Sequence, residues 1–360
     1  MSETFSMLSD VRGQAAAVEA LRRLTAAGGP VPPLLFHGPE GVGKRTAALA
    51  FAAALVCREP SGTDGCGRCS SCRRVADAPL VTDLRARSTA QDSPRAYPDA
   101  GLVSIPGKKT RISVLQARDI AASLATRPFE LPFRVYIVDP AEKMTLAAAN
   151  ALLKTLEEPP PYAVLVLISQ SPWQLPITVR SRLRPLGFRP LSGSDIEELL
   201  IREGIPEDEA AARGLRGRGN LTRARDMDPD RERRTVEAWV QILERATEPR
   251  HAGALATAAA AELAGSPDEA RHALALLLGI VRDLATADAG QELLYLSREQ
   301  SERLAPHAQR LVGFAATKAV LIDQLRREAD IFNRNPRLTL EGAVLALSGH
   351  LGPADLIIRD

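Results

Sequence analysis

The 360-residue sequence lacks several features that would assign it to a class at once. Net charge is almost absent, since 46 basic residues oppose 44 acidic ones, which argues against a protein that coats nucleic acid along its whole length. There is no basic amino-terminal segment followed by an apolar run, and no apolar stretch of about 20 residues. We therefore expect a cytoplasmic protein that does not enter a membrane, with an ordinary composition and two or three domains.

Cysteine is equally scarce, and its few positions are clustered. The four cysteines are Cys57, Cys66, Cys69 and Cys72, and none lies elsewhere. In a reducing compartment such clustering favours a metal site over disulfides. Four soft thiolates suit tetrahedral Zn²⁺ and leave no position open for water, so the spacing predicts a structural zinc site. Two alternatives stay open, namely four independent buried cysteines and an iron–sulfur cluster.

Short apolar runs alternate with helical patterns in the first half of the chain. LLF at 34–36, VYIV at 135–138 and VLVLI at 164–168 read as buried strands, and a further apolar segment ends at Phe188. The segment 146–158, LAAANALLKTLEE, has helical spacing. Strands that alternate with helices predict an α/β fold with a mostly parallel sheet.

The character of the sequence changes after Phe188. We predict an α/β domain over 1–188 with the cysteine module at 57–72, a small helical domain over 189–228, and an all-helical domain over 229–360. Residues 85–110 have little periodicity and are predicted to form a long loop.

A glycine-rich motif follows the first predicted strand. Gly38, Gly41, Gly43 and Lys44 match G-x-x-x-x-G-K, in which backbone N–H groups and the lysine cradle phosphates at a helix N-terminus. The hydroxyl residue that should follow the lysine to bind Mg²⁺ is replaced by Arg45. Thr46 lies one residue later. Because each step along a helix turns the side-chain direction by about 100°, the Thr46 hydroxyl would not reach the position of the missing ligand.

The acidic half of such a site is also altered. Asp139 ends the VYIV strand as in a Walker B element, where it would support Mg²⁺. Pro140 stands where a glutamate commonly polarises the attacking water, and Glu142 is three residues too far along to replace it. The sequence therefore predicts no intrinsic ATP hydrolysis, and only a vestigial ATP/Mg²⁺ site.

The order of motifs resembles a known family. FHGPEGVGK, the four-cysteine insertion, VYIVDPAEKM, NALLKTLEEPP, LPITVRSR and NRNPRLTLE are similar to the bacterial DNA polymerase III clamp loader, strongly over 13–190 and more weakly near the C-terminus. The resemblance implies an AAA+ module, a helical lid and a helical collar. It also implies a hetero-pentameric ring with gamma/tau and delta subunits, which places the sliding clamp on primer–template DNA as part of the polymerase holoenzyme.

Within this family the chain looks most like the delta-prime type. Both delta-prime and the ATP-hydrolysing subunits carry the zinc module and the LEEPP helix, so the altered residues Arg45 and Pro140 are what favour delta-prime. One alternative is a gamma/tau-type ATPase that uses Lys44, Thr46 and Asp139. A second is an AAA+ adaptor outside replication.

The resemblance also implies roles for single residues. Ser181-Arg182 is similar to the family's Ser-Arg-Cys motif, although Leu183 replaces the cysteine, and it implies that Arg182 reaches a neighbouring subunit's ATP as an arginine finger. Residues 169–171 follow the VLVLI strand as either a phosphate sensor or a polar turn, and Arg223 is a lid-sensor candidate whose register is ambiguous.

Charge is divided unevenly along the chain. Residues 1–188 carry 23 basic and 16 acidic side chains, whereas residues 189–360 carry 23 and 28. The near-neutral total therefore combines a basic α/β part with an acidic helical part, and any DNA contact is expected to be local and made within the assembly.

Overall fold

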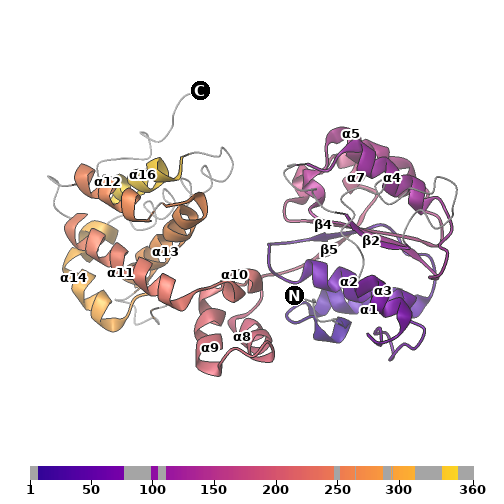
Figure 1. Cartoon of the computed structure of the whole chain (residues 1–360), viewed down its shortest axis with the longest axis horizontal. Helices are drawn as coiled ribbons and strands as arrows, with labels where there is room; N and C mark the ends of the chain where they lie inside the picture. Colours follow the sequence, from indigo (N-terminus) through magenta and orange to yellow (C-terminus); the bar gives the residue numbers. More distant parts are fainter. Residues whose placement is uncertain are drawn as a thin grey trace. The chain divides into compact units, whose positions relative to one another are not determined.

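The computed structural model describes two compact units, which are treated separately (Figure 1). The first comprises residues 1–225 and the second residues 226–360. The described residues are 7–76, 99–103, 111–246, 252–263, 265–286, 293, 295–312 and 335–347. No helix among these residues is both long and apolar enough to cross a membrane.

A five-stranded parallel sheet forms the centre of the first unit. The strands lie in the order β2-β3-β4-β1-β5, and all four neighbouring pairs are parallel. Their bounds are β1 Leu34–His37, β2 Ala100–Val103, β3 Arg134–Val138, β4 Ala163–Ser169 and β5 Arg184–Gly187. The predicted α/β fold with a parallel sheet is confirmed.

Helices cover both faces of this sheet (Figure 1). One face carries α1, α2 and α3, and the other carries α4, α5 and α7. Two layers of this kind bury a parallel sheet completely, which explains why its strands read as continuous apolar runs. The bounds are α1 Ala15–Ala27, α2 Lys44–Val56, α3 Ser70–Ala76, α4 Val114–Leu124, α5 Leu146–Ala151, α6 Leu153–Glu157 and α7 Ile177–Arg180. Three short 3₁₀ turns are η1 Leu8–Asp10, η3 Ala141–Lys143 and η4 Pro172–Gln174.

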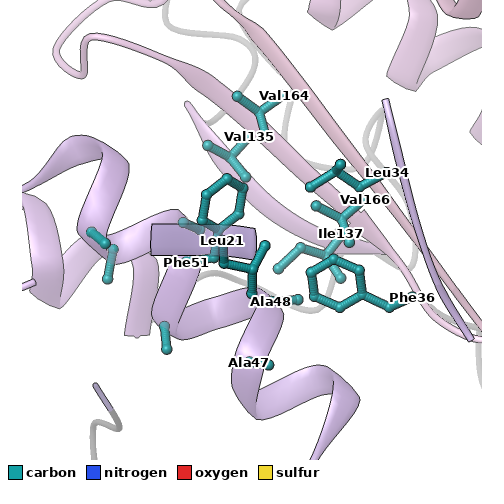
Figure 2. Packing of buried hydrophobic residues seen from close by; sticks show 14 of the residues in the cluster. Leu21, Leu34, Phe36, Ala47, Ala48, Phe51, Val135, Ile137, Val164 and Val166 are labelled. Atoms are coloured by element: carbon teal, nitrogen blue, oxygen red, sulfur yellow. The ribbon is translucent and has the colours of Figure 1, made fainter. Parts of the chain in front are cut away.

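Alternate strand residues enter two separate cores. Val135 and Ile137 pack with Phe36 and Phe51 on the α1/α2 side (Figure 2). Tyr136, between them in sequence, belongs to the core on the α4/α5 side. This alternation is the period of two of a pleated strand, and it fixes the register of the sheet.

Two predicted segments differ from the structure. The predicted loop 85–110 contains strand β2, which pairs in register with β3 from Ala100↔Val135 to Val103↔Val138, while residues 77–98 and 104–110 lie outside the described residues. A four-residue strand with an internal glycine has little local signal, and its pairing with β3 creates it. The single predicted helix 146–158 divides at Leu152, whose N–H bonds back to Ala149 in a tightened turn.

Three short helices complete the first unit. They are α8 Gly193–Arg202, α9 Glu207–Arg216 and α10 Leu221–Arg225, and they share a small core around Ile196 and Leu200. Helix α8 begins with a capping box, because the Ser192 hydroxyl accepts from the Asp195 N–H and the Asp195 carboxylate accepts from the Ser192 N–H.

The second unit contains helices and no strand among its described residues. Its helices are α11 Pro229–Ala246, α12 Ala252–Leu263, α13 Pro267–Thr286, α14 Arg298–Val312 and α16 Pro336–Leu347. Trp239 is fully buried at its centre, and its indole N–H donates to the Ala273 carbonyl at 2.9 Å. Residues 313–334 of the predicted all-helical domain lie outside the described residues.

Candidate functional site

The glycine-rich loop joins β1 to α2 and needs glycine for steric reasons. Gly38 and Gly41 both have positive φ, at 145° and 69°. A Cβ on Gly38 would overlap the Phe188 carbonyl oxygen, and one on Gly41 would overlap the Asn220 side chain. Gly43, with φ of 88°, is the N-cap residue of α2. The loop therefore has the backbone curvature of a phosphate loop, and other parts of the first unit lie directly against it.

Lys44 points into its own loop. Its ammonium group donates to the Gly38 carbonyl at 2.7 Å and also to the Pro39 carbonyl. Burial lowers the pKa of Lys44, and the nearby carboxylates of Asp139 and Glu142 partly oppose that effect. The charge that would bind a phosphate is satisfied here by carbonyl groups of the loop.

Arg45 pairs with Asp139, the carboxylate that we predicted would support Mg²⁺. Its Nε lies 2.8 Å from Asp139 Oδ2, although the two residues are 94 positions apart. Asp139 directly follows β3, so the fold brings this carboxylate to the first turn of α2. The residue that replaces the hydroxyl ligand therefore also neutralises the acidic ligand.

The polar residues after β4 are occupied in local turns. The Ser171 N–H donates to the Ser169 hydroxyl at 3.1 Å, and the Gln170 N–H donates to Glu142 Oε1 at 3.2 Å. Glu142 thus ties η3 to the end of β4. These contacts correspond to the polar-turn alternative for residues 169–171.

The three-helix subdomain contacts the glycine-rich loop directly. The Leu221 N–H donates to the Gly41 carbonyl at 2.8 Å. Gln14 is buried and bridges both sides, since its side-chain amide donates to the Arg189 carbonyl at 2.7 Å and to the Val42 carbonyl at 3.3 Å. Its amide oxygen accepts from the Arg189 N–H. Sequence reasoning missed these contacts, although Gln14 lies within residues 13–190, the range of the strong resemblance.

Arg223 is on the helix that carries this contact. Its N–H caps the turn by donating to the Asn220 side-chain oxygen at 2.9 Å. Asn220 is the residue that fills the space above Gly41. The structure therefore places Arg223 on α10, two residues beyond the N–H that bonds to the glycine-rich loop.

The four cysteines converge at the end of α2. Their sulfur atoms all lie within 4.8 Å of one another. Backbone N–H groups point at the sulfurs, with Cys66 N to Cys57 Sγ at 3.2 Å and Cys69 N to Cys66 Sγ at 3.3 Å. Four thiols held this closely by N–H donors form a donor set that can bind a tetrahedral metal ion.

The pKa values of these thiols differ because their surroundings differ. Burial raises the pKa of Cys57 and of Cys72. Burial also acts on Cys69, but the N–H groups of Arg58 and Cys72 outweigh it and lower the pKa of Cys69 to about 6. A metal that binds all four sulfurs must therefore displace protons from the two thiols with raised pKa values.

Arg182 lies just beyond α7, on a segment separate from the glycine-rich loop. Its guanidinium group forms an ion pair with Glu157 at 2.7 Å and donates to the Thr178 carbonyl at 2.7 Å. Among the described residues, no hydrogen bond or ion pair joins it to residues 38–45. Arg182 is thus presented at the surface, held from two sides.

Comparison with known proteins identifies the family. A family model described as DNA polymerase III, delta subunit, matches residues 13–192, which is half of the chain. The chain belongs to this family. The match covers the sheet, the glycine-rich loop, the cysteine cluster and Arg182.

Curated relatives of this clamp-loader chain include two subunit types. It is 34% identical over 174 residues to the delta-prime subunit of Bacillus subtilis, covering 48% of this chain and 46% of that protein. It is 32% identical over 178 residues to the delta-prime subunit of Pseudomonas aeruginosa, covering 49% of each. It is 29% identical over 188 residues to the tau subunit of Bacillus subtilis, covering 49% of this chain and 30% of that protein. The chain spans about half the length or less of these relatives.

Proposed function

We propose that this chain is a non-hydrolysing, delta-prime-type subunit of the DNA polymerase III clamp loader. The observation that carries the proposal is the ion pair between Arg45 and Asp139 at 2.8 Å. In a working site a hydroxyl at position 45 and the Asp139 carboxylate would hold Mg²⁺, which neutralises charge on the phosphates. Here a guanidinium group takes the place of the first ligand and covers the second.

Arg182 is the residue that we propose to act on ATP, in trans. A planar, forked cation stabilises the charge that develops on a transferred phosphoryl group. The support is its exposed position and its two anchoring contacts, with Glu157 and the Thr178 carbonyl. In this proposal the glycine-rich loop only connects the sheet to the three-helix subdomain. Its residues are Gly38, Gly41, Gly43 and Lys44.

The four cysteines are proposed to hold one structural Zn²⁺. The ion would join the end of α2 to the start of α3 through Cys57 and Cys72. With four thiolate ligands no position remains for a reacting water, so the ion would stabilise the fold of the module and take no part in phosphate chemistry.

The partners follow from the family and complete the proposal. The chain would occupy one position in a cytoplasmic hetero-pentameric ring with gamma/tau and delta subunits. The ring would load the sliding clamp on primer–template DNA. The excess of basic side chains in residues 1–188 supports a place for this domain near DNA phosphates or a neighbour's ATP.

ATP turnover by the isolated chain and by a reconstituted ring tests the proposal. The isolated chain is expected to have negligible turnover. The substitution Arg182→Ala should reduce turnover at the one site it serves by roughly 10³-fold or more, so that the ring loses that site's share. Arg23→Ala, which removes an exposed arginine on α1, is the matched control and should leave turnover unchanged. Normal turnover by the Arg182→Ala ring would remove the finger assignment.

A gamma/tau-type ATPase is the second candidate, because a tau subunit is among the similar relatives. It predicts Mg²⁺-dependent ATP hydrolysis by the isolated chain. Loss of that hydrolysis on Lys44→Ala would establish this candidate and refute ours. An adaptor role outside replication would instead give a chain that fails to assemble with clamp-loader subunits.

A further inference from the structure

The segment before Arg182 exposes an unusual amount of apolar surface. Trp173 in η4 is 78% exposed, the most exposed large hydrophobic side chain of the described residues, and Ile177 in α7 is 65% exposed. The core contacts of this segment are already made by Leu175, Val179 and Leu183, which are buried at intervals of four residues. Trp173 and Ile177 therefore face outward, while the buried leucine and valine side chains of the same segment hold it in the core.

Positive charge lies beside this apolar surface. The Arg180 guanidinium carbon lies 5.3 Å from the centre of the Trp173 ring, which is cation–π distance. The sequence from 159 to 194 contains four arginines and no acidic residue. Trp173, Ile177 and Arg180 together are called the Trp173 face.

The Trp173 face is joined rigidly to Arg182. The Ile177 carbonyl accepts from the Ser181 N–H at 2.9 Å, and the Thr178 carbonyl accepts from the Arg182 side chain at 2.7 Å. The residues that precede and follow α7 are thus fixed by its single turn. The Trp173 face and Arg182 thus belong to one short exposed segment, residues 173–182.

We infer that the Trp173 face is the anchoring surface for the neighbouring clamp-loader subunit that binds the nucleotide reached by Arg182. The inference rests on the proposed function and adds a division of roles, in which Arg182 acts on the phosphates and Trp173 with Ile177 supplies affinity. Charge complementarity selects this occupant, because the segment 159–194 carries four arginines, of which only Arg182 pairs with a carboxylate among the described residues, that of Glu157, in a contact named above. A segment with this excess of positive charge suits a partner surface that carries a nucleoside triphosphate. Exposed Trp beside Arg is also the composition of interface residues that dominate binding energy.

The test titrates the full-length chain into purified gamma/tau-type and delta-type subunits with ATP. The readouts are the half-saturating concentration for assembly and the turnover at saturation. Trp173→Ala should raise the half-saturating concentration roughly 30-fold, the effect of an interface residue worth about 2 kcal/mol. Trp173→Phe should recover most of the affinity. Leu215→Ala, which removes an exposed aliphatic side chain on α9, is the control and should change neither readout.

Arg182→Ala should give the opposite pattern, with reduced turnover at saturation and a nearly unchanged half-saturating concentration. Assembly of the Trp173→Ala chain within about threefold of wild type would overturn the inference and leave the proposed function intact, since threefold is far below a hot-spot effect. Failure of the wild-type chain to assemble at all would overturn both. Because Trp173 is exposed, circular dichroism of Trp173→Ala should match wild type, so a weaker assembly reports the surface.

Discussion

A buried ion pair at the edge of the sheet gives a prediction whose size follows from the structure. Arg134, at the start of β3, is 1% exposed and lies 3.0 Å from Asp99, whose side chain is 8% exposed. The same carboxylate accepts from three successive backbone N–H groups, those of residues 129–131, at 2.7 to 3.1 Å. It therefore holds β3 to the turn that precedes it and lies next to the first residue of β2.

Asp99→Ala should destabilise the first unit strongly. Breaking one side of a buried ion pair costs about 3–5 kcal/mol, because the remaining charge stays buried without its partner. For a unit of 225 residues this corresponds to a fall in Tm of roughly 6 °C or more, at about 2–4 °C per kcal/mol. The Tm of Asp99→Asn should lie between those of wild type and Asp99→Ala. The amide oxygen can still accept hydrogen bonds but carries no charge.

Differential scanning calorimetry of the full-length chain with saturating zinc measures this effect. Glu19→Ala is the matched control in the same unit, because it removes an exposed ion pair with Arg23 and should shift Tm by less than about 2 °C. A shift of that small size for Asp99→Ala as well would refute the reasoning. It would mean that water or Ser123, which accepts from Arg134 at 3.0 Å, compensates the lost carboxylate.

Two further predictions concern zinc and pH. The purified chain should contain about one zinc ion per molecule by metal analysis. Cys69→Ser should reduce this metal content and lower the Tm of the first unit. Less than about 0.5 zinc per wild-type chain would contradict the four-ligand site. Hydrogen bonds from Gln300 and Arg303 lower the pKa of Glu237 in the second unit. This contribution to stability is present above the unfolded pKa of about 4.3 and is lost as pH falls through the lower folded value. Glu237→Gln should therefore reduce the acid sensitivity of the second unit's Tm between pH 5 and 3, and an unchanged pH profile would count against the pairing.

The local features of the sequence predicted the fold of the first unit well. Continuous apolar runs at 34–36, 135–138 and 164–168 became central strands, because a strand buried on both faces shows its identity in composition. The cysteine cluster was equally readable, since all four ligands come from one short stretch. Strand β2 could not be read in this way, because the short AGLV run becomes a strand only by pairing with β3.

The long-range contacts around the glycine-rich loop were not visible in local patterns. The sequence showed that Arg45 replaces a hydroxyl, but its partner Asp139 is 94 residues away and is brought to it by the strand order. The bridge from Gln14 to Arg189 spans 175 residues. The same holds for Glu157 in the string NALLKTLEEPP. It pairs with Arg182 because the fold brings the end of α6 beside the segment that follows α7.

These long-range contacts show that the chain keeps the glycine-rich loop between strand and helix, while the positive charges around that loop pair with groups of the chain itself. The cations at the start of α2 are both satisfied within the chain, Lys44 by carbonyl groups of the loop and Arg45 by Asp139. The three-helix subdomain is fastened to the same loop through the Leu221 N–H, which donates to the Gly41 carbonyl. By contrast, Arg182 is held by the Thr178 carbonyl, the Ser181 hydroxyl and Glu157, whose side chain is 49% exposed against 16% for Asp139. Exposed ion pairs are weak, so in the proposed function a triphosphate on another subunit can compete for Arg182. This distribution of positive charge is what we expect if, as proposed, the chain supports ATP hydrolysis at a site on a neighbouring subunit.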